Sequence, residues 1–246
     1  MMMAALLNWI DLIVFLFLSI ISIFVLSMNE IKQLQKIYVW FHLAILLWPF
    51  GQFSLNLTNN LRYQWLYVNI SFLGIILISC LWLVISLFFT LRLNRQRTVI
   101  TRWAILPPLV IGICISLNPW LGWFATPHDG SYIYRSYGPF FWIMVCMAGA
   151  YVILGCLMLI SSLRVRGGGL RNQTLLLIFA QVLLVAFWSA DIAFNYNSFK
   201  EQDILPGLSS LGIMLSYLCF AVAVQRYSTY KVVSLAHDAF IDSMES

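Results

Sequence analysis

Two carboxylates stand out in this 246-residue sequence because each lies within or beside a long apolar run. An ionisable group in such a run is expensive to bury, so it indicates pairing, binding or transport. Asp11 follows Asn8 by three residues at the start of a run, the spacing of a capping box, where a helix dipole favours negative charge. Asp191 lies near the end of its run, where the dipole disfavours it, so it needs a partner or a function. A structural ion pair is favoured over ligand contact, with these cations in reach: Arg62, Arg135 and Lys200.

Amide and aromatic side chains gather in the halves of the apolar runs that are expected to face outward. Pro49 and Pro119 lie at the same depth, and a helix break there is tolerated only beside protein or a wet cavity. These features predict an outward-facing pocket with aromatic walls. An aromatic belt at the membrane interface, with hydrogen bonds between helices, is the alternative interpretation. The candidate ligand-binding residues are Trp48, Gln52, Asn69, Asn118, Trp188 and Asp191.

Catalytic and metal-binding patterns are not recognised in the sequence. His237 precedes Asp238, an order typical of histidines that accept a phosphoryl group, but the basic residue and proline expected soon afterwards are missing. A histidine on a helix surface is therefore the favoured interpretation. His42 and His128 stand alone, and the five cysteines lie singly in apolar runs. We expect no catalytic site, no metal and no cofactor in this chain.

The composition excludes a soluble domain, because 62% of the residues are hydrophobic, 9% are charged and the mean hydropathy is +0.89. Runs of about 20 apolar residues are long enough to cross a bilayer as helices. The second run is expected to be interrupted around Pro49. The predicted fold is an all-α, polytopic membrane protein, a bundle of seven transmembrane helices. The predicted spans are Leu6–Ser27, Ile37–Leu57, Trp65–Leu91, Trp103–Ala125, Pro139–Leu163, Thr174–Phe194 and Ile204–Gln225.

The basic residues predict the orientation. With the N-terminus outside, the inner segments hold Lys32, Lys36, Arg92, Arg95, Arg97, Arg102, Arg164, Arg166, Arg171, Arg226 and Lys231. The outer segments hold only Arg62, Arg135 and Lys200. Short cytoplasmic loops are rich in Lys and Arg, so we expect an outside N-terminus and a cytoplasmic C-terminus. The net charge of +5 then reflects contact with the bilayer, and nucleic acid is not an expected partner.

The C-terminal segment changes character after Arg226. Asp203 and Pro206 suit the start of the last predicted span, and an amphipathic stripe follows it. Its apolar members are Val232, Val233, Ala236, Phe240 and Met244. We expect residues 1–226 to form the membrane domain and residues 227–246 to form a cytoplasmic exit helix. Such a stripe needs a partner, either a second copy in a homodimer or a domain that follows.

The order of short motifs along the chain resembles the N-terminal seven-helix region of bacterial sensor histidine kinases, a region also found ahead of diguanylate cyclases. The motifs are Trp48-Pro49, the run from Trp82 to Leu93, Ile105-Leu106-Pro107-Pro108, Asn118-Pro119, Arg171-Asn172-Gln173, Asp203-Ile204-Leu205-Pro206, and the exit from Gln225-Arg226-Tyr227 to Met244. Ala186-Phe187-Trp188-Ser189 departs from the family, which has a proline and an asparagine there.

The resemblance implies a sensor input domain in the bacterial inner membrane. It would detect a small-molecule or peptide stimulus at the outer face. Its output would pass through the seventh span to PAS and kinase domains of the full-length protein, which would carry out phosphotransfer.

Other seven-helix or membrane classes fit the sequence less well. A small-solute transporter, or a stand-alone membrane protein, is the alternative; against a transporter stand the missing internal repeat and the lack of charge in the central membrane layer. A rhodopsin-like protein needs a lysine in the last span, and none lies between Ile204 and Gln225. The same span lacks the Asn-Pro-aromatic motif of G-protein-coupled receptors.

Overall fold

The computed structural model describes residues 2–27, 32–90, 94–128, 130–164, 168–198 and 207–223. Its helices are α1 (Met2–Ser27), α2 (Lys32–Asn56), α3 (Leu61–Thr90), α4 (Asn94–Ser116), the short α5 (Asn118–Leu121), α6 (Pro139–Leu163) and α7 (Gly168–Ser198). A last described helix, Leu208–Ala223, is called the terminal helix below. Two antiparallel strands, β1 (Ala125–His128) and β2 (Ser131–Tyr137), form a hairpin between α5 and α6.

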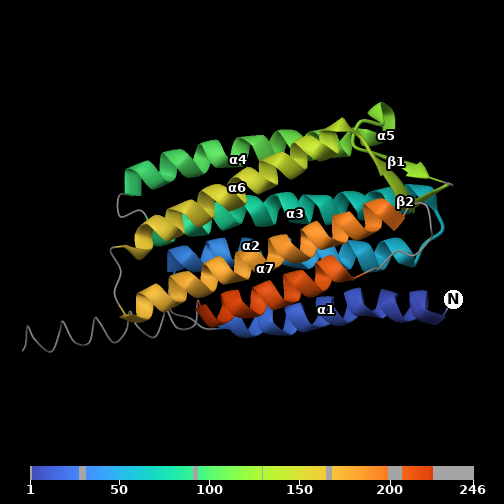
Figure 1. Ribbon diagram of the computed structural model, residues 1–246. Helices are drawn as coiled ribbons and strands as arrows, with labels where there is room; N and C mark the ends of the chain where they lie inside the picture. The colour runs from blue at the N-terminus through green and yellow to red at the C-terminus, as the bar shows by residue number, and fades with distance from the viewer. Residues whose placement is uncertain are drawn as a thin grey trace, which may run out of the picture.

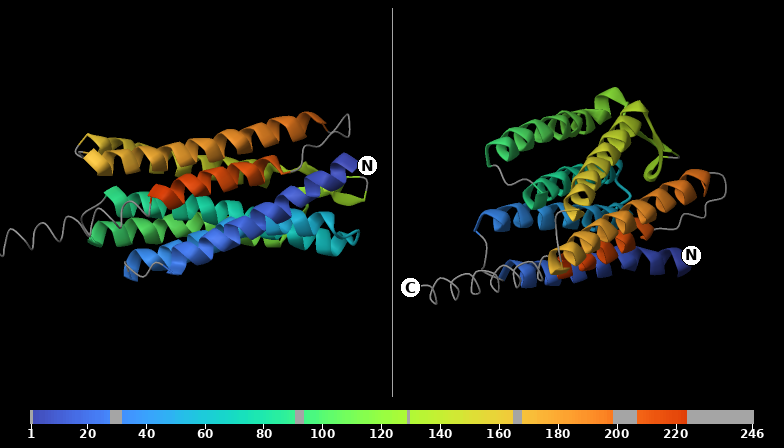
Figure 2. Two further views of the ribbon diagram at one scale, coloured as in Figure 1. Left: turned by 90° about the horizontal axis from the view of Figure 1, so that it is seen from below. Right: turned by 60° about the vertical axis from the view of Figure 1, so that its left-hand side comes forward.

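The long helices lie side by side in an elongated bundle with α3 at its centre (Figure 1). α3 contacts α2, α4 and α6, and it also contacts β2. A central helix needs apolar residues on every side, and α3 has them, with Phe72, Trp82 and Ile85 almost fully buried. The terminal helix lies between α1 and α7 in the views of Figures 1 and 2. The seventh predicted span is therefore an integral part of the bundle.

One end of the bundle carries the N-terminus and the β1–β2 hairpin, and we call it the hairpin end (Figure 1). Gln64 at the start of α3 fastens the hairpin to the α2–α3 connection. Its Nε2 donates to the Thr58 carbonyl oxygen at 2.8 Å, and its Oε1 accepts from the Tyr132 backbone N–H at 2.9 Å and from the Ser131 hydroxyl at 3.1 Å. The side chain is buried, so these bonds satisfy its polar atoms and fix the hairpin against the helices.

Within the part of the chain that the structure describes, three stretches are long and apolar enough to cross a membrane: Leu61–Thr90, Pro139–Leu163 and Arg171–Ala193. Three shorter apolar helical stretches accompany them: Trp9–Phe24, Trp103–Ser116 and Leu208–Ala223. Large apolar side chains such as Trp103, Leu109 and Ile113 of α4 are exposed, as expected where a helix faces acyl chains. The all-α class is confirmed apart from the hairpin. That the chain crosses the membrane seven times stays a prediction.

Two predicted features of the bundle are wrong. The fourth span was expected to reach Ala125, but α4 ends at Ser116 and the chain continues into α5 and β1. Asn118 and Pro119 start a new short helix there, because proline suits a first helical turn and not an interior. The expected break around Pro49 is also absent, since α2 runs unbroken from Lys32 to Asn56. The predicted exit helix, residues 227–246, lies outside the described residues.

Candidate ligand-binding site

A cavity of about 200 Å³ lies among α2, α3, α6, α7 and the terminal helix. Its lining comes from the second half of α2 and of α7 and from the start of the terminal helix, which places it toward the hairpin end. The lining residues are Trp48, Ile75, Ile78, Ser79, Val145, Ala148, Gly149, Val152, Gln181, Leu184, Val185, Trp188, Ser189, Ser209 and Ile213. A mostly apolar cavity with a few polar groups is the usual form of a small-molecule site.

The structure brings three of the six predicted ligand-binding residues to this cavity or directly behind its wall. Trp48 of α2 and Trp188 of α7 line it. Asp191 stands behind Ser209, whose hydroxyl donates to Asp191 Oδ2 at 2.5 Å. The aromatic walls and the carboxylate that the sequence suggested therefore lie near one another, contributed by helices far apart in the chain.

The other three predicted residues do not line the cavity. Gln52 is half-buried on α2 and Asn69 is buried on α3. Asn118 is buried at the start of α5, where its Oδ1 accepts from the backbone N–H groups of Phe124 and Ala125 at 2.7 and 3.1 Å. Its Nδ2 donates to the Ala125 carbonyl oxygen at 2.6 Å. These three bonds hold the turn that leads into β1.

Asn118→Ala is expected to destabilise the fold, because it leaves buried backbone groups of Phe124 and Ala125 without their partner. Such a loss is worth about 1–3 kcal/mol, which corresponds to a Tm lower by about 3–10 °C for a chain of this size. Thermal unfolding in detergent measures the change. Ser116→Ala is the control, because the Ser116 hydroxyl is exposed and bonds only within its own helix, to the Gly112 carbonyl oxygen. Equal Tm values for the two variants would contradict this role of Asn118.

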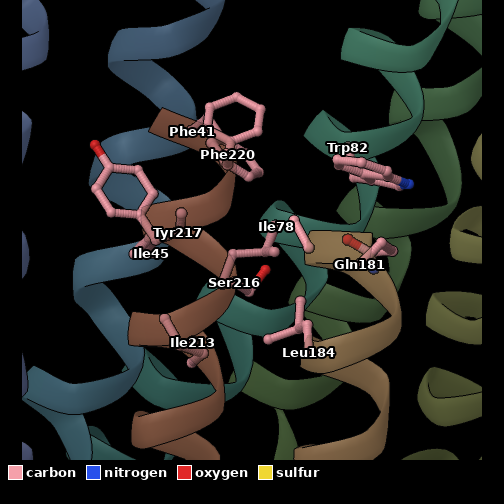
Figure 3. A pocket seen from close by; sticks show the side chains of 11 residues that line it. Phe41, Ile45, Ile78, Trp82, Gln181, Leu184, Ile213, Ser216, Tyr217 and Phe220 are labelled. Carbon is pink, nitrogen blue, oxygen red and sulfur yellow. The ribbon is translucent and has the colours of Figure 1, made fainter. Parts of the chain in front are cut away.

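Gln181 of α7 is a polar group that the predicted site did not include. Its side chain is 3% exposed, its Nε2 has no hydrogen-bond partner in the described structure, and it lines the cavity. It also lines a second cavity of about 10 Å³, with Trp82 and Ser216 among the neighbours (Figure 3). The signal in the sequence is a single amide within an otherwise apolar run.

Hydrogen bonds between side chains tie the terminal helix to its neighbours. The Ser210 hydroxyl donates to Asp11 of α1, and the Ser209 hydroxyl donates to Asp191 of α7. The Tyr217 hydroxyl lies 2.5 Å from His42 Nδ1 of α2. The Tyr217 hydroxyl points away from the other residues that line the small cavity (Figure 3). The terminal helix is therefore joined by polar contacts to α1, α2 and α7.

These contacts correct two predictions. Asp11 was placed at a helix start, but α1 begins at Met2, so Asp11 lies in roughly the third turn and is 1% exposed. Its bond to Ser210, not a helix dipole, explains a buried carboxylate there. His42 was expected to stand alone, but it contacts Tyr217 both through the hydroxyl and edge-on, with ring centroids 5.1 Å apart.

Close packing complements the polar contacts of the terminal helix. A Cβ atom added at Gly212 would lie 2.3 Å from Cβ of Phe187 on α7, so only a glycine allows this approach of the two helices. Phe220 packs on Phe41 of α2 with ring centroids 4.7 Å apart. Within the described ranges, no group of three or more His, Cys, Asp and Glu side chains is arranged to hold a metal ion.

A bundle with several long apolar helices and a cavity among them defines an integral membrane protein of the helical class. Residues 11–233 match the family described as the N-terminal 7TM region of histidine kinase, and the chain belongs to this family. The resemblance inferred from the order of motifs is thereby confirmed, and a membrane location with it. A comparison with curated proteins gives no match.

Proposed function

We propose that this chain is the input domain of a sensor histidine kinase, in which the cavity receives the stimulus and the terminal helix transmits it. One observation carries this proposal: Ser209 and Ile213 of the terminal helix form part of the cavity wall. A molecule in the cavity would therefore touch the same helix that leads toward the C-terminal segment. Residues 1–226 would be the sensor domain, and residues 227–246 the helix that joins it to PAS and kinase modules.

Transmission requires two arrangements of the terminal helix that the stimulus stabilises unequally. The contacts of this helix with Asp11, His42 and Asp191 are few, and each is worth about 1 kcal/mol net. A switch from 1:99 to 99:1 needs about 5.5 kcal/mol of differential binding. Loss of these three contacts would cost about 3 kcal/mol, so a ligand whose affinities for the two arrangements differ by a few kcal/mol would move the equilibrium.

For the site residues, the proposal assigns Trp48 and Trp188 to the aromatic wall and Asp191 to the support of Ser209. Ligand contact by Gln52, Asn69 and Asn118 stays a prediction, since these three side chains lie outside the cavity lining. The proposed partners are the lipid bilayer, a second copy of the chain through the exit helix, and the kinase modules that follow in the full-length protein.

Tyr217→Phe is expected to shift basal kinase output toward the stimulated level, because it removes the hydroxyl that contacts His42 and Ser22. A loss of about 1–1.5 kcal/mol changes the ratio of two arrangements roughly 5- to 13-fold. Autophosphorylation of the chain fused after Ser246 to a kinase module measures the shift.

Tyr151→Phe is the matched control for this experiment. Tyr151 is also buried, and its hydroxyl donates to the Ala104 carbonyl oxygen at 2.7 Å, but it joins α6 to α4 and does not touch the terminal helix. The control should leave output unchanged. Equal effects of the two substitutions would mean that the terminal helix has no special part in the response.

The proposed orientation places the hairpin end outside the cell and the C-terminus in the cytoplasm. Fourteen basic residues divide into eleven inner and three outer positions, which is the asymmetry that orients membrane proteins. Reporters placed after Ser246 and after Gly130 should therefore signal opposite sides of the inner membrane. Gly130 suits an insertion because it lies in the hairpin turn, and nothing lies within 4 Å of a Cβ atom built there. Signals from the same side would refute an odd number of spans between Gly130 and Ser246, and with it the proposed seven-span topology.

A further inference from the structure

The cavity opens toward the outside of the bundle between α6 and α7. Gly149 of α6 lines it, and a Cβ atom added there would meet nothing within 4 Å. On the α7 side, Val185 is 38% exposed and Ser189 is exposed as well. Exposed apolar side chains such as Ile153 continue the same surface. Because the outer surface of a membrane bundle faces acyl chains, this opening leads into the lipid phase and not directly into water.

Among the fully buried polar atoms of the described lining, Gln181 Nε2 is the one without a hydrogen-bond partner. The Ser79 hydroxyl donates to the Ile75 carbonyl oxygen at 2.9 Å, and the Ser209 hydroxyl donates to Asp191. Gln181 Nε2 is buried and has no partner in the described structure. Among the described residues that line the cavity, none carries a charge. A buried amide N–H without a partner is costly, and an acceptor atom placed beside it would remove that cost.

We propose that the cavity binds a small, uncharged, mainly apolar molecule that carries one hydrogen-bond acceptor and that enters from the bilayer between α6 and α7. The acceptor would bind Gln181 Nε2, and the apolar body would lie between Trp48 and Trp188. A charged molecule is disfavoured, because it would lose its hydration without gaining an opposite charge. A dry cavity of about 150 Å³ in another protein holds benzene, so about 200 Å³ suits a substituted benzene. The claim that this molecule is the stimulus rests on the proposed function. The claim that it binds in the cavity is independent of that function.

Two probes of nearly equal shape test the ligand class: 4′-fluoroacetophenone, which has a carbonyl acceptor, and 1-ethyl-4-fluorobenzene, which has none. Their binding to the full 246-residue chain in lipid nanodiscs is measured by ¹⁹F NMR, with empty nanodiscs to correct for partition into lipid. The ketone should bind more tightly than the hydrocarbon by roughly three- to tenfold, the value of one added hydrogen bond. Gln181→Leu should abolish this preference while leaving the hydrocarbon bound.

A second pair of variants tests the place of binding. Gly149→Leu should fill the cavity and abolish binding of both probes, because there is room for a side chain at this position. Ala150→Leu is the control, since Ala150 is the next residue of α6, is exposed and does not line the cavity. Equal binding by these two variants, or an unchanged ketone preference in Gln181→Leu, would overturn the proposal.

The outcome can be separated from the failure of the proposed function. If both probes bind as expected but neither they nor Gly149→Leu alter kinase output, the ligand class stands and the sensory role of the cavity fails. If neither probe binds in a way that depends on Gly149, the ligand class fails. The comparison of Tyr217→Phe with Tyr151→Phe then still decides whether the terminal helix transmits a signal.

Discussion

Gly212→Ala is expected to force the terminal helix away from α7 and to lock kinase output in one state. The added methyl group would stand 2.3 Å from Cβ of Phe187, an atom at the base of its side chain that cannot rotate away. The two helices must therefore separate, and this movement would break the hydrogen bond between Ser209 and Asp191. Overpacking of this kind costs about 1–3 kcal/mol, enough to change the ratio of two arrangements roughly 5- to 150-fold.

Gly112→Ala is the matched control, because it makes the same chemical change in α4, outside the cavity lining, where the nearest atom to an added Cβ is Leu73 Cδ2 at 3.3 Å, the end of a flexible side chain. Both variants gain the same helix propensity, so a difference between them reports the contact with Phe187. Autophosphorylation of the kinase fusion, with and without stimulus, measures the effect, and thermal unfolding shows whether the bundle persists. If Gly212→Ala responds to stimulus like Gly112→Ala, the contact between the terminal helix and α7 does not take part in signalling.

The helices could be predicted from the sequence wherever the signal is local. The helix from Pro139 to Leu163 has the predicted bounds, because proline suits the first helical turn and an apolar run continues it. The hairpin was missed, although Asp129-Gly130 is a turn pair and the tyrosines of Ser131–Tyr137 favour a strand. A short polar hairpin among long apolar runs is easily taken for a loop.

Contacts between helices could not be predicted, because membrane helices are apolar on most sides and their periodicity does not reveal their neighbours. Ser210 and Asp11 are 199 residues apart, and Tyr217 and His42 are 175 residues apart. Each residue viewed alone has an ordinary explanation, such as a helix start for Asp11. Only the fold shows that residues of the terminal helix form hydrogen bonds with these distant residues.

Part of the candidate site could be predicted from the types and positions of single residues, but the contacts of each residue could not. Trp48 and Trp188 were identified by their depth and their rings, and both line the cavity. Asn118 was included because an amide in an apolar run indicates either a ligand contact or a structural bond, and sequence does not distinguish them. Its three hydrogen bonds to the backbone of Phe124 and Ala125 make the structural role plain.

The register between the terminal helix and the C-terminal segment is the property on which the proposed transmission depends. The sequence predicts that Val233, Ala236, Phe240 and Met244 form an apolar stripe, which would pack against a second copy as in a short parallel coiled coil. One residue inserted between Arg226 and Ser234 would turn this stripe by about 100°, whereas seven residues, close to two helical turns, would nearly restore its direction.

Autophosphorylation of kinase fusions that carry these two insertions is the most direct test that the terminal helix transmits the signal. The one-residue insertion should lock or invert the response to stimulus, and the seven-residue insertion should largely recover it. If both insertions respond alike, the connection is a flexible tether and transmission through the terminal helix is wrong.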